Sequence, residues 1–467
     1  MPSVPLIRTF IQERDSSGEH PPPRYLQEAN SKVYVAHPGE IAAPNCGFPI
    51  CTALTQERRT ELLMDLRDII DVDIRDPTFS LNSMRQGIHL WSREISTEYS
   101  FLHRELLFLR DHDETGEAVL EIMGEPPGAQ LVWSTITFGW ALMRSKNDQE
   151  FHTASRIQRA IRTNILSHPR LTSNPPLWLV QTLFIVLLFA RYQGTSEECG
   201  AASMFHGVLL EAVLRLDCGA EKVLNHPRRR CESATLNWIA WVEAEAVRRL
   251  IVQTFVLDVK HAFLFGGEPT MTFRDMMNLR IPSDLDGAWY AQTSGEWETA
   301  MSCVDITATP PSFIELLKEF WRPTASDPYS NSSLSGSITV MYGILSVARE
   351  VARREDSVIS QRPNHQPSSL GNTVERSLVV WEQSWRTARS NSNLPWMVPS
   401  CTCVLQLAQS TLYDVSPVDL QVIAGKHVIE GKRKGPTDYS NAQRKIRLWA
   451  KEERGRKGVA GPCVPFH

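Results

Sequence analysis

Acidic side chains gather in one stretch of the sequence at spacings that invite comparison with metal sites. Aspartates recur over residues 65–76, namely Asp65, Asp68, Asp71, Asp73 and Asp76. Carboxylate oxygens are ligands that Mg²⁺ prefers, and helical enzymes that act on prenyl diphosphates hold this ion with aspartates on facing helices. The stretch lacks an adjacent aspartate pair with a third acid one turn further on, so it favours a solvated helix face. Magnesium-dependent prenyl diphosphate chemistry, in a helical enzyme of secondary metabolism, is kept as the alternative.

Cysteine and histidine residues follow no spacing typical of a metal site. Two pairs of cysteines lie close together in the sequence: Cys46 with Cys51, and Cys401 with Cys403. A zinc site needs two neighbouring pairs, or one pair followed by two histidines, and neither pattern occurs. His206 and His261 lie in apolar stretches, so we expect core histidines with bonded ring nitrogens rather than ligands. Because the motifs of hydrolases and phosphate-binding loops are also missing, the sequence predicts no catalytic residue, metal, cofactor or enzyme activity.

One pair of opposite charges lies inside a strongly apolar stretch, residues 238–258. This stretch is apolar almost all round, which is typical of a helix in the centre of a domain. Glu245 precedes Arg249 by four residues, the favourable order for an ion pair on one helical face. We interpret the pair as structural rather than catalytic, and expect Arg248 and Asp258 to join the same network.

Several further segments show the apolar spacing of helices, whereas alternating strand patterns are scarce. We predict helices over residues 55–70, 88–102, 131–142, 177–190, 201–216, 338–354 and 373–389. In the segment 201–216 the apolar positions include Met204, Val208, Leu209 and Val213. A short capped helix is expected from Thr272, followed by extended backbone up to a proline. The predicted fold class is all-α, with a large multi-helix domain.

Composition changes along the chain suggest its organisation. Residues 1–56 are rich in proline, serine, glycine and charge, which predicts a disordered, weakly ordered lead. We expect a helical domain over 57–322, a linker over 323–337, a helical continuation over 338–424 and a basic tail over 425–467.

Overall composition excludes several classes of protein. The chain has 467 residues, of which 42% are hydrophobic and 22% charged, as in soluble folded proteins. Its net charge of -4 suggests no overall attraction to nucleic acid or membrane. Nine scattered cysteines favour reduced thiols inside a cell. The longest apolar run, Leu177–Ala190, spans 14 residues and is shorter than the roughly 18 that a membrane helix needs. We therefore expect no membrane partner.

The C-terminal segment is the one strongly basic part of the sequence. Residues 432–457 contain ten Lys and Arg residues and three acidic ones. The candidate contacts are Lys432, Arg433, Lys434, Arg444, Lys445 and Arg447. Composition leaves three interpretations open: a solvated helix, a nuclear-import patch, or contacts to DNA phosphates.

An ordered set of segments resembles a known family. Tyr99-Ser-Phe-Leu-His103 stands where that family has Phe-Pro-x-x-His, and the helix around Gly139 carries the small residue at its middle. The most extensive match is a signature set in the central helix, with Trp289 and Trp297 downstream. We call these seven the signature residues: Trp238, Trp241, Glu245, Arg248, Arg249, Phe255 and Asp258. Together they resemble the regulatory middle homology domain of fungal transcription factors, which usually accompanies Cys2His2 or binuclear zinc-cluster DNA-binding domains.

This resemblance implies an all-α regulatory domain that acts in the nucleus. Its implied partners are the transcription machinery, other regulators, and DNA through the basic tail or a missing finger. Zinc would enter only with such a finger, because neither a Cys2His2 finger nor a six-cysteine cluster occurs in this sequence. A third hypothesis is that the chain is a helical scaffold without a regulatory role.

Overall fold

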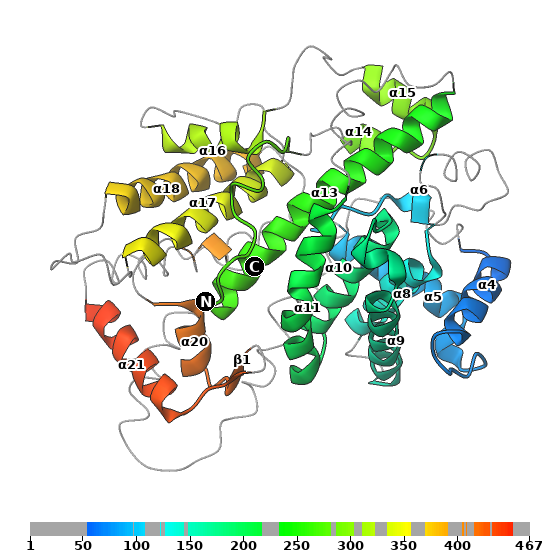
Figure 1. Ribbon diagram of the computed structural model, residues 1–467, viewed down its shortest axis with the longest axis horizontal. Coiled ribbons are helices and arrows are strands. Elements are labelled where there is room, and N and C mark those ends of the chain that lie inside the picture. Colours follow the sequence, from blue (N-terminus) through cyan, green and yellow to red (C-terminus); the bar gives the residue numbers. More distant parts are fainter. Residues whose placement is uncertain are drawn as a thin grey trace. The chain divides into compact units, whose positions relative to one another are not determined.

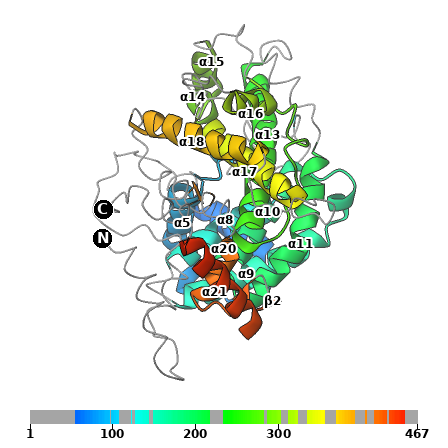
Figure 2. The same ribbon diagram turned by 90° about the vertical axis from the view of Figure 1, so that its left-hand side faces the viewer.

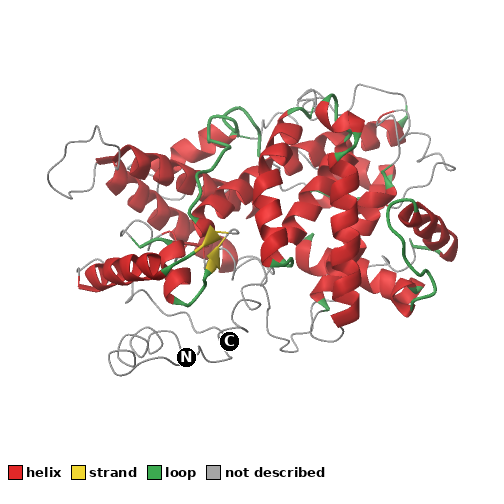
Figure 3. Cartoon of the chain, turned by 60° about the horizontal axis from the view of Figure 1, so that its bottom comes forward, coloured by secondary structure: helices red, strands yellow, loops and turns green. Residues whose placement is uncertain are grey.

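Most of the described chain is helical (Figure 3), which confirms the predicted all-α fold class. The structure is a computed structural model that describes residues 54–96, 98–107, 122, 127–143, 148–216, 233–281, 286–302, 311–322, 334–355, 369–390, 404–405, 408, 415–429 and 432–451. The chain forms two compact units, whose described parts are 54–262 with 268–390, and 263–267 with 404–451. The predicted lead up to residue 53, the cysteine pairs and residues 323–333 of the predicted linker lie outside the described residues.

Among the first helices of the larger unit, α4 and α8 begin close to the predicted starts at 55 and 131, whereas the predicted helix 88–102 is wrong in its bounds and α9 was not predicted. Their bounds are α4 (Gln56–Arg67), α5 (Leu81–Leu90), the π-helical turn η2 (Trp91–Ile95), α6 (Arg104–Leu107), α8 (Ala129–Leu142) and α9 (Asp148–Leu166). Short 3-10 turns cover Pro77–Phe79 and Pro169–Thr172. The Thr55 hydroxyl accepts a hydrogen bond from the Arg58 backbone N–H at 3.2 Å, as expected for a residue that caps a helix.

Helix α8 packs closely against α4 and α5 through one glycine and two tryptophans. The backbones of α5 and α8 meet at Gly87 and Gly139, where a Cβ atom on Gly139 would lie 1.8 Å from the Gly87 carbonyl oxygen. The Trp133 indole donates to the Leu62 carbonyl at 2.8 Å, and the Trp140 indole to the Ser83 carbonyl at 3.0 Å. These contacts explain why a glycine stands in the middle of this helix.

Three long helices build the middle of the larger unit (Figure 1). They are α10 (Leu177–Tyr192), α11 (Ser196–Leu214) and α13 (Ala234–Phe265). Residues 179–191 of α10 are all buried, which accounts for the longest apolar run of the sequence. None of the described helices has the length and apolarity to cross a bilayer. Helix α13 spans 32 residues and extends beyond both ends of the predicted helix 238–258.

The remaining helices of the larger unit are α14 (Asp286–Trp289), α15 (Ser294–Ser302), α16 (Phe313–Trp321), α17 (Leu334–Glu355) and α18 (Ser369–Ser390). Helices α16, α17 and α18 lie side by side (Figures 1 and 2). The expected short helix after Thr272 is instead a series of turns. The Thr272 hydroxyl accepts from the Arg274 N–H at 3.2 Å, so it closes a local turn rather than capping a helix. Arg280 is extended, as predicted, and bridges Ser312.

The smaller unit contains part of the segment predicted as a basic tail. Its elements are α20 (Pro417–Ile423), β1 (Val428–Ile429), β2 (Lys432–Arg433) and α21 (Pro436–Lys451). The two strands are antiparallel, with Val428 opposite Arg433. A small apolar cluster of Val422, Ile429 and Ala442 holds these elements together, with Phe265 packed against it. Residues 417–451 therefore form a folded surface that carries the six basic candidates.

Candidate functional site

Helix α13 places the signature residues inside the larger unit. All seven side chains are buried, with exposed fractions of 5% or less. A helix that is apolar all round packs on every side, and the prediction that residues 238–258 form an interior helix is confirmed.

A buried carboxylate between two arginines forms the polar centre of this helix. We call Glu245, Arg248 and Arg249 the Glu245 cluster. Arg249 donates from Nε to Glu245 Oε1 at 2.8 Å, and Arg248 Nη2 bonds to Glu245 Oε2. Spacings of three and four residues bring these side chains to the same face of the helix. The predicted Glu245 and Arg249 pair is present, and Arg248 belongs to the same network as expected.

Arg249 also binds neutral groups from other parts of the chain, which help to stabilise its buried positive charge. Its Nη1 donates to the Ser100 hydroxyl at 3.0 Å. Its guanidinium carbon lies 4.4 Å from the centre of the Trp289 ring, a distance typical of a cation–π contact. The guanidinium therefore joins α13 to the segment before α6 and to α14.

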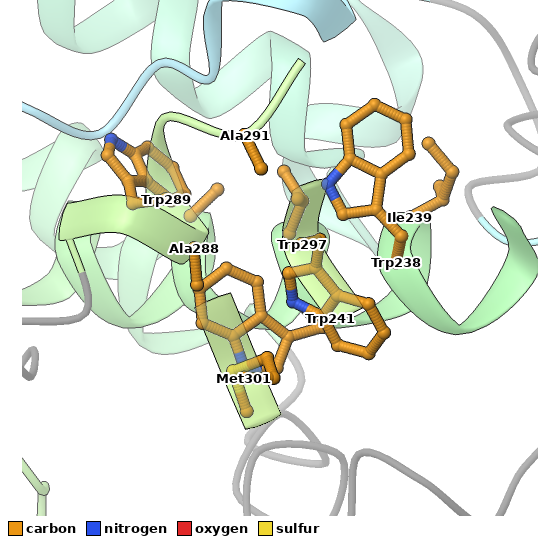
Figure 4. Close-up of a cluster of buried hydrophobic side chains, with 10 residues drawn as sticks. Trp238, Ile239, Trp241, Ala288, Trp289, Ala291, Trp297 and Met301 are labelled. Atoms are coloured by element: carbon orange, nitrogen blue, oxygen red, sulfur yellow. The ribbon is translucent and has the colours of Figure 1, made fainter. Parts of the chain in front are cut away.

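Tryptophans from α13, α14 and α15 surround the beginning of α13 (Figure 4). The Trp241 and Trp297 rings lie 6.1 Å apart. The His103 ring lies edge-on to Trp238 at 5.9 Å and to Trp289 at 5.2 Å. Burial, together with the nearby positive charge of Arg249, lowers the pKa of His103 to about 3. This imidazole is therefore neutral near pH 7, which suits a packed aromatic core.

Residues 98–103 form a clamped segment between α10 and α13. Phe101 packs on Phe184 of α10, with ring centres 4.7 Å apart. The Phe101 carbonyl accepts from the Gln181 amide at 3.0 Å, and Glu98 pairs with Lys260 of α13 at 2.9 Å. The roles of Ser100, Glu98 and Lys260 were missed by the sequence analysis. Their partners lie 149 and 162 residues away in the sequence, so no local pattern could reveal them.

Asp258 belongs to a different network from the one expected. Its Oδ1 lies 2.7 Å from His206 Nε2, and its Oδ2 accepts from the Met271 N–H at 2.7 Å. The expectation that Asp258 joins the Glu245 cluster is wrong, because 13 further residues advance a helix by about 20 Å. Asp258 instead fixes α13 to α11 and to the chain that follows α13. His206 is a buried core histidine, as expected, but its Nδ1 has no hydrogen-bond partner.

Phe255 completes the signature set at a third position along α13. Its ring packs against Phe313 of α16 at 5.6 Å. The structure thus joins the first five signature residues to residues 98–103 and α14–α15, and places Phe255 and Asp258 at separate contacts. All of these contacts join elements of one core.

Other residues that could do chemistry lie on the surface. The side chains of Asp65, Asp68, Asp71 and Asp73 are exposed, as a solvated face requires. Asp76 caps a 3-10 turn by accepting from the Thr78 N–H at 2.8 Å. Within the described ranges, no group of three His, Cys, Asp or Glu residues is placed to hold a metal ion. A hollow of about 430 Å³ beside Arg59, Met64 and Arg75 includes none of the signature residues.

The six basic candidates lie on β2, just after it, and on α21. Lys432, Arg433, Arg444 and Arg447 are exposed, and Lys434 is half-buried. Lys445 is exposed too and pairs with Asp419 of α20 at 3.2 Å. The small folded unit therefore presents most of these charges to solvent.

Comparison with known proteins gives a consistent result. A family model described as "Fungal specific transcription factor domain" matches residues 88–383. "Zinc finger protein klf1" of Schizosaccharomyces pombe is 26% identical over 77% of this chain and 44% of its own length. The "Nicotinate catabolism cluster-specific transcription factor" of Emericella nidulans is 21% identical over 86% of this chain and 46% of its own length. "Zinc finger protein zas1" of Schizosaccharomyces pombe is 23% identical over 70% of this chain and 36% of its own length.

These matches cover less than half the length of each of the three relatives. No solved structure matches the chain significantly. Transcription factors are not enzymes, so the matches bear out the expectation of a protein without catalytic activity and do not favour the prenyl diphosphate alternative.

Proposed function

Since the chain belongs to the fungal specific transcription factor domain family, we propose that it is the regulatory domain of a fungal regulator of RNA polymerase II transcription. One observation supports this proposal above the others: the family match over residues 88–383 includes every signature residue. In this proposal the signature residues are a rigid interior, and the surface around them receives the regulatory contacts.

The proposed place of action is the nucleus, and the proposed partners are DNA, the transcription machinery and other regulators. Two relatives carry the words "zinc finger protein" in their names. If zinc serves this protein, we propose that it does so in a separate finger and not in the described residues. The contribution of this chain is then control of transcription rather than zinc-dependent reading of sequence.

A tethering experiment tests the regulatory role. The full chain is fused to an unrelated DNA-binding domain and expressed in a fungal host with a matching reporter gene. We expect the fusion to change reporter expression relative to the DNA-binding domain alone. Glu245→Gln should remove the effect because it breaks the buried cluster, whereas Glu61→Gln, on an exposed helix face, should keep it. A folded, nuclear fusion that leaves the reporter unchanged would contradict the proposal.

We further propose that the six basic candidates contact DNA phosphates. The exposure of Lys432, Arg433, Arg444 and Arg447 on one small unit supports this role. Phosphate contacts release counterions, so affinity should fall steeply with salt and show little sequence preference. Replacing Arg444 and Arg447 with glutamate should weaken binding of the full chain to duplex DNA and flatten its salt dependence. Arg67→Glu, an exposed arginine of α4, is the control.

Nuclear import through the same residues is the competing role, and it is separable. If the double variant binds DNA normally but a tagged chain leaves the nucleus, the residues serve import instead. If neither property changes, they form a solvated surface only.

A further inference from the structure

Helix α11 is apolar on two faces, and the described residues of the chain cover only one of them. Ala202, Leu209 and Val213 are buried on the inner face, which packs against α10. On the outer face Met204 is 81% exposed, Val208 37% and Leu214 51%. Met204 and Val208 are apolar positions of the helix that the sequence predicts over residues 201–216. Exposed apolar side chains at regular helical spacing mark a contact surface.

The outer face forms a continuous stripe along α11. We define the outer stripe by its members: Glu197, Ala201, Met204, Gly207, Val208, Glu211, Leu214 and Arg215. The spacing of three and four residues keeps them on one side of the helix. Gly207 makes an open, flat position at the middle, since a Cβ atom there would meet nothing within 4 Å. The stripe thus alternates small positions with bulky ones.

We propose that the outer stripe binds the outer stripe of a second copy of this chain, with the two α11 helices antiparallel about a two-fold axis between Gly207 and Val208. In this register Gly207 lies opposite Val208 of the second copy, and Ala201 lies opposite Leu214. Met204 lies opposite Glu211, whose methylene groups can cover it. Each branched apolar residue therefore meets a small one, which allows the close approach that helix packing requires.

The charges at the two ends of the stripe fix the same orientation. Glu197 is exposed at the beginning of α11. Arg215, just beyond its last turn, donates to the Thr172 carbonyl and lies 3.8 Å from Glu211 of its own chain, and its side chain is still 47% exposed. An antiparallel pair places Arg215 of each copy near Glu197 of the other, and it also pairs opposite ends of the helix dipoles. A parallel pair would place like charges together. The stripe is thus complementary to itself in one orientation, which favours a second copy over an unrelated helix as its occupant.

The expected dimer is weak and reversible. The stripe runs from residue 197 to residue 215, which corresponds to about 27 Å of helix. A single helix pair of this length buries less surface than a stable dimer of standard size. We therefore expect dissociation at about micromolar concentration.

Sedimentation of the full chain over about 1–100 μM, a range that brackets a weak interface, tests the proposal. The native chain should shift from monomer to dimer. Gly207→Leu and Val208→Glu should each weaken association at least about tenfold. Gly207→Leu is the decisive variant, because leucine favours a helix more than glycine does and enters open space in the monomer. Unfolding by urea should show that this variant keeps its stability. Met64→Glu, at an apolar residue that is 64% exposed on α4, should leave the dimer unchanged.

A charge exchange tests the orientation. Glu197→Arg and Arg215→Glu should each weaken the dimer, and the double variant should recover it. A chain that stays monomeric throughout, or a dimer that survives both Gly207→Leu and Val208→Glu, would overturn the proposal. Recovery that fails in a still-folded double variant would overturn the antiparallel register.

Discussion

The Glu245 carboxylate compensates the buried positive charges of Arg248 and Arg249, so replacing this residue should lower the free energy of unfolding. Its carboxylate is 1% exposed and contacts two guanidinium groups that are also buried. A buried charge that loses its partner is strongly destabilising, whereas a charge on the surface is screened by water. This contrast leads to a comparison of two carboxylates in the same unit.

Glu245→Gln should lower the free energy of unfolding by about 3–5 kcal/mol, because it leaves Arg248 and Arg249 without a counter-charge. Glu61→Gln removes a carboxylate that pairs with Arg58 at 3.0 Å on the surface, and should cost about 0–1 kcal/mol. Urea unfolding, followed by tryptophan fluorescence, measures both. Equal losses would show that the Glu245 cluster does not stabilise the core.

His103 should make the protein sensitive to acid. Its pKa in the folded chain is about 3 and the ordinary value is 6.5, so the unfolded state binds a proton first as pH falls. The contribution of the neutral ring is therefore complete above pH 6.5 and is lost as pH falls from 6.5 toward 3. Between pH 7 and pH 5 this loss amounts to about 2 kcal/mol.

His103→Phe removes this titration and keeps an aromatic ring. The fall in unfolding free energy between pH 7 and pH 5 should be smaller in the variant than in the native chain by about 2 kcal/mol. The comparison uses the difference between two pH values, so a general loss of packing cancels. An identical fall in both proteins would mean that His103 is protonated within the folded state.

At the scale of elements, the contact between Gly87 and Gly139 allows helices α5 and α8 to lie unusually close together. A Cβ atom on Gly139 would lie 1.8 Å from a backbone oxygen of α5, and backbone cannot turn away as a side chain can. The helices must separate to admit even one methyl group. Helix α11 offers the opposite case, because Gly207 faces open space.

Gly139→Ala should therefore destabilise the protein by about 1–3 kcal/mol. Gly207→Ala, in dilute protein, should stabilise it by about 0.4–1 kcal/mol, since alanine restricts the unfolded chain more than glycine does. Both are glycine-to-alanine changes within helices, so their difference reports the contact alone. Thermal unfolding measures it, and a stabilised Gly139→Ala variant would refute the close packing.

Local sequence patterns predicted where helices form better than they predicted the contacts between helices. The cap at Thr55 and the apolar spacing around residues 62–66 depend on neighbours within one or two turns, so they can be read directly. The turns after Thr272 were predicted as a helix because the same hydroxyl contact serves both structures. Asp258 was assigned to the wrong network because helical spacing shows a face but not the partner that meets it. The Ser100 contact required the folded chain.

At the scale of the whole molecule, the segment that the family model matches does not have the same bounds as either compact unit. Residues 88–383 cover most of the described larger unit, while the basic candidates lie in the smaller unit. The two units also differ in the size of their apolar interiors. The larger unit buries aromatic side chains of many helices, whereas the cluster in the smaller unit has three buried members, Val422, Ile429 and Ala442. Small cores give marginal stability.

The smaller unit should therefore open first, and it should do so independently of the larger one. Ala442 is 1% exposed at the centre of its cluster, so Ala442→Glu buries a charge there and should unfold α20 and α21. Hydrogen exchange in residues 417–451 should then become fast, while α8 and α10 keep the protection of the native chain. Leu448→Glu changes a residue of the same helix that is 58% exposed and should leave exchange unaltered. Protection lost equally in α8 would mean that the two units unfold as one cooperative structure.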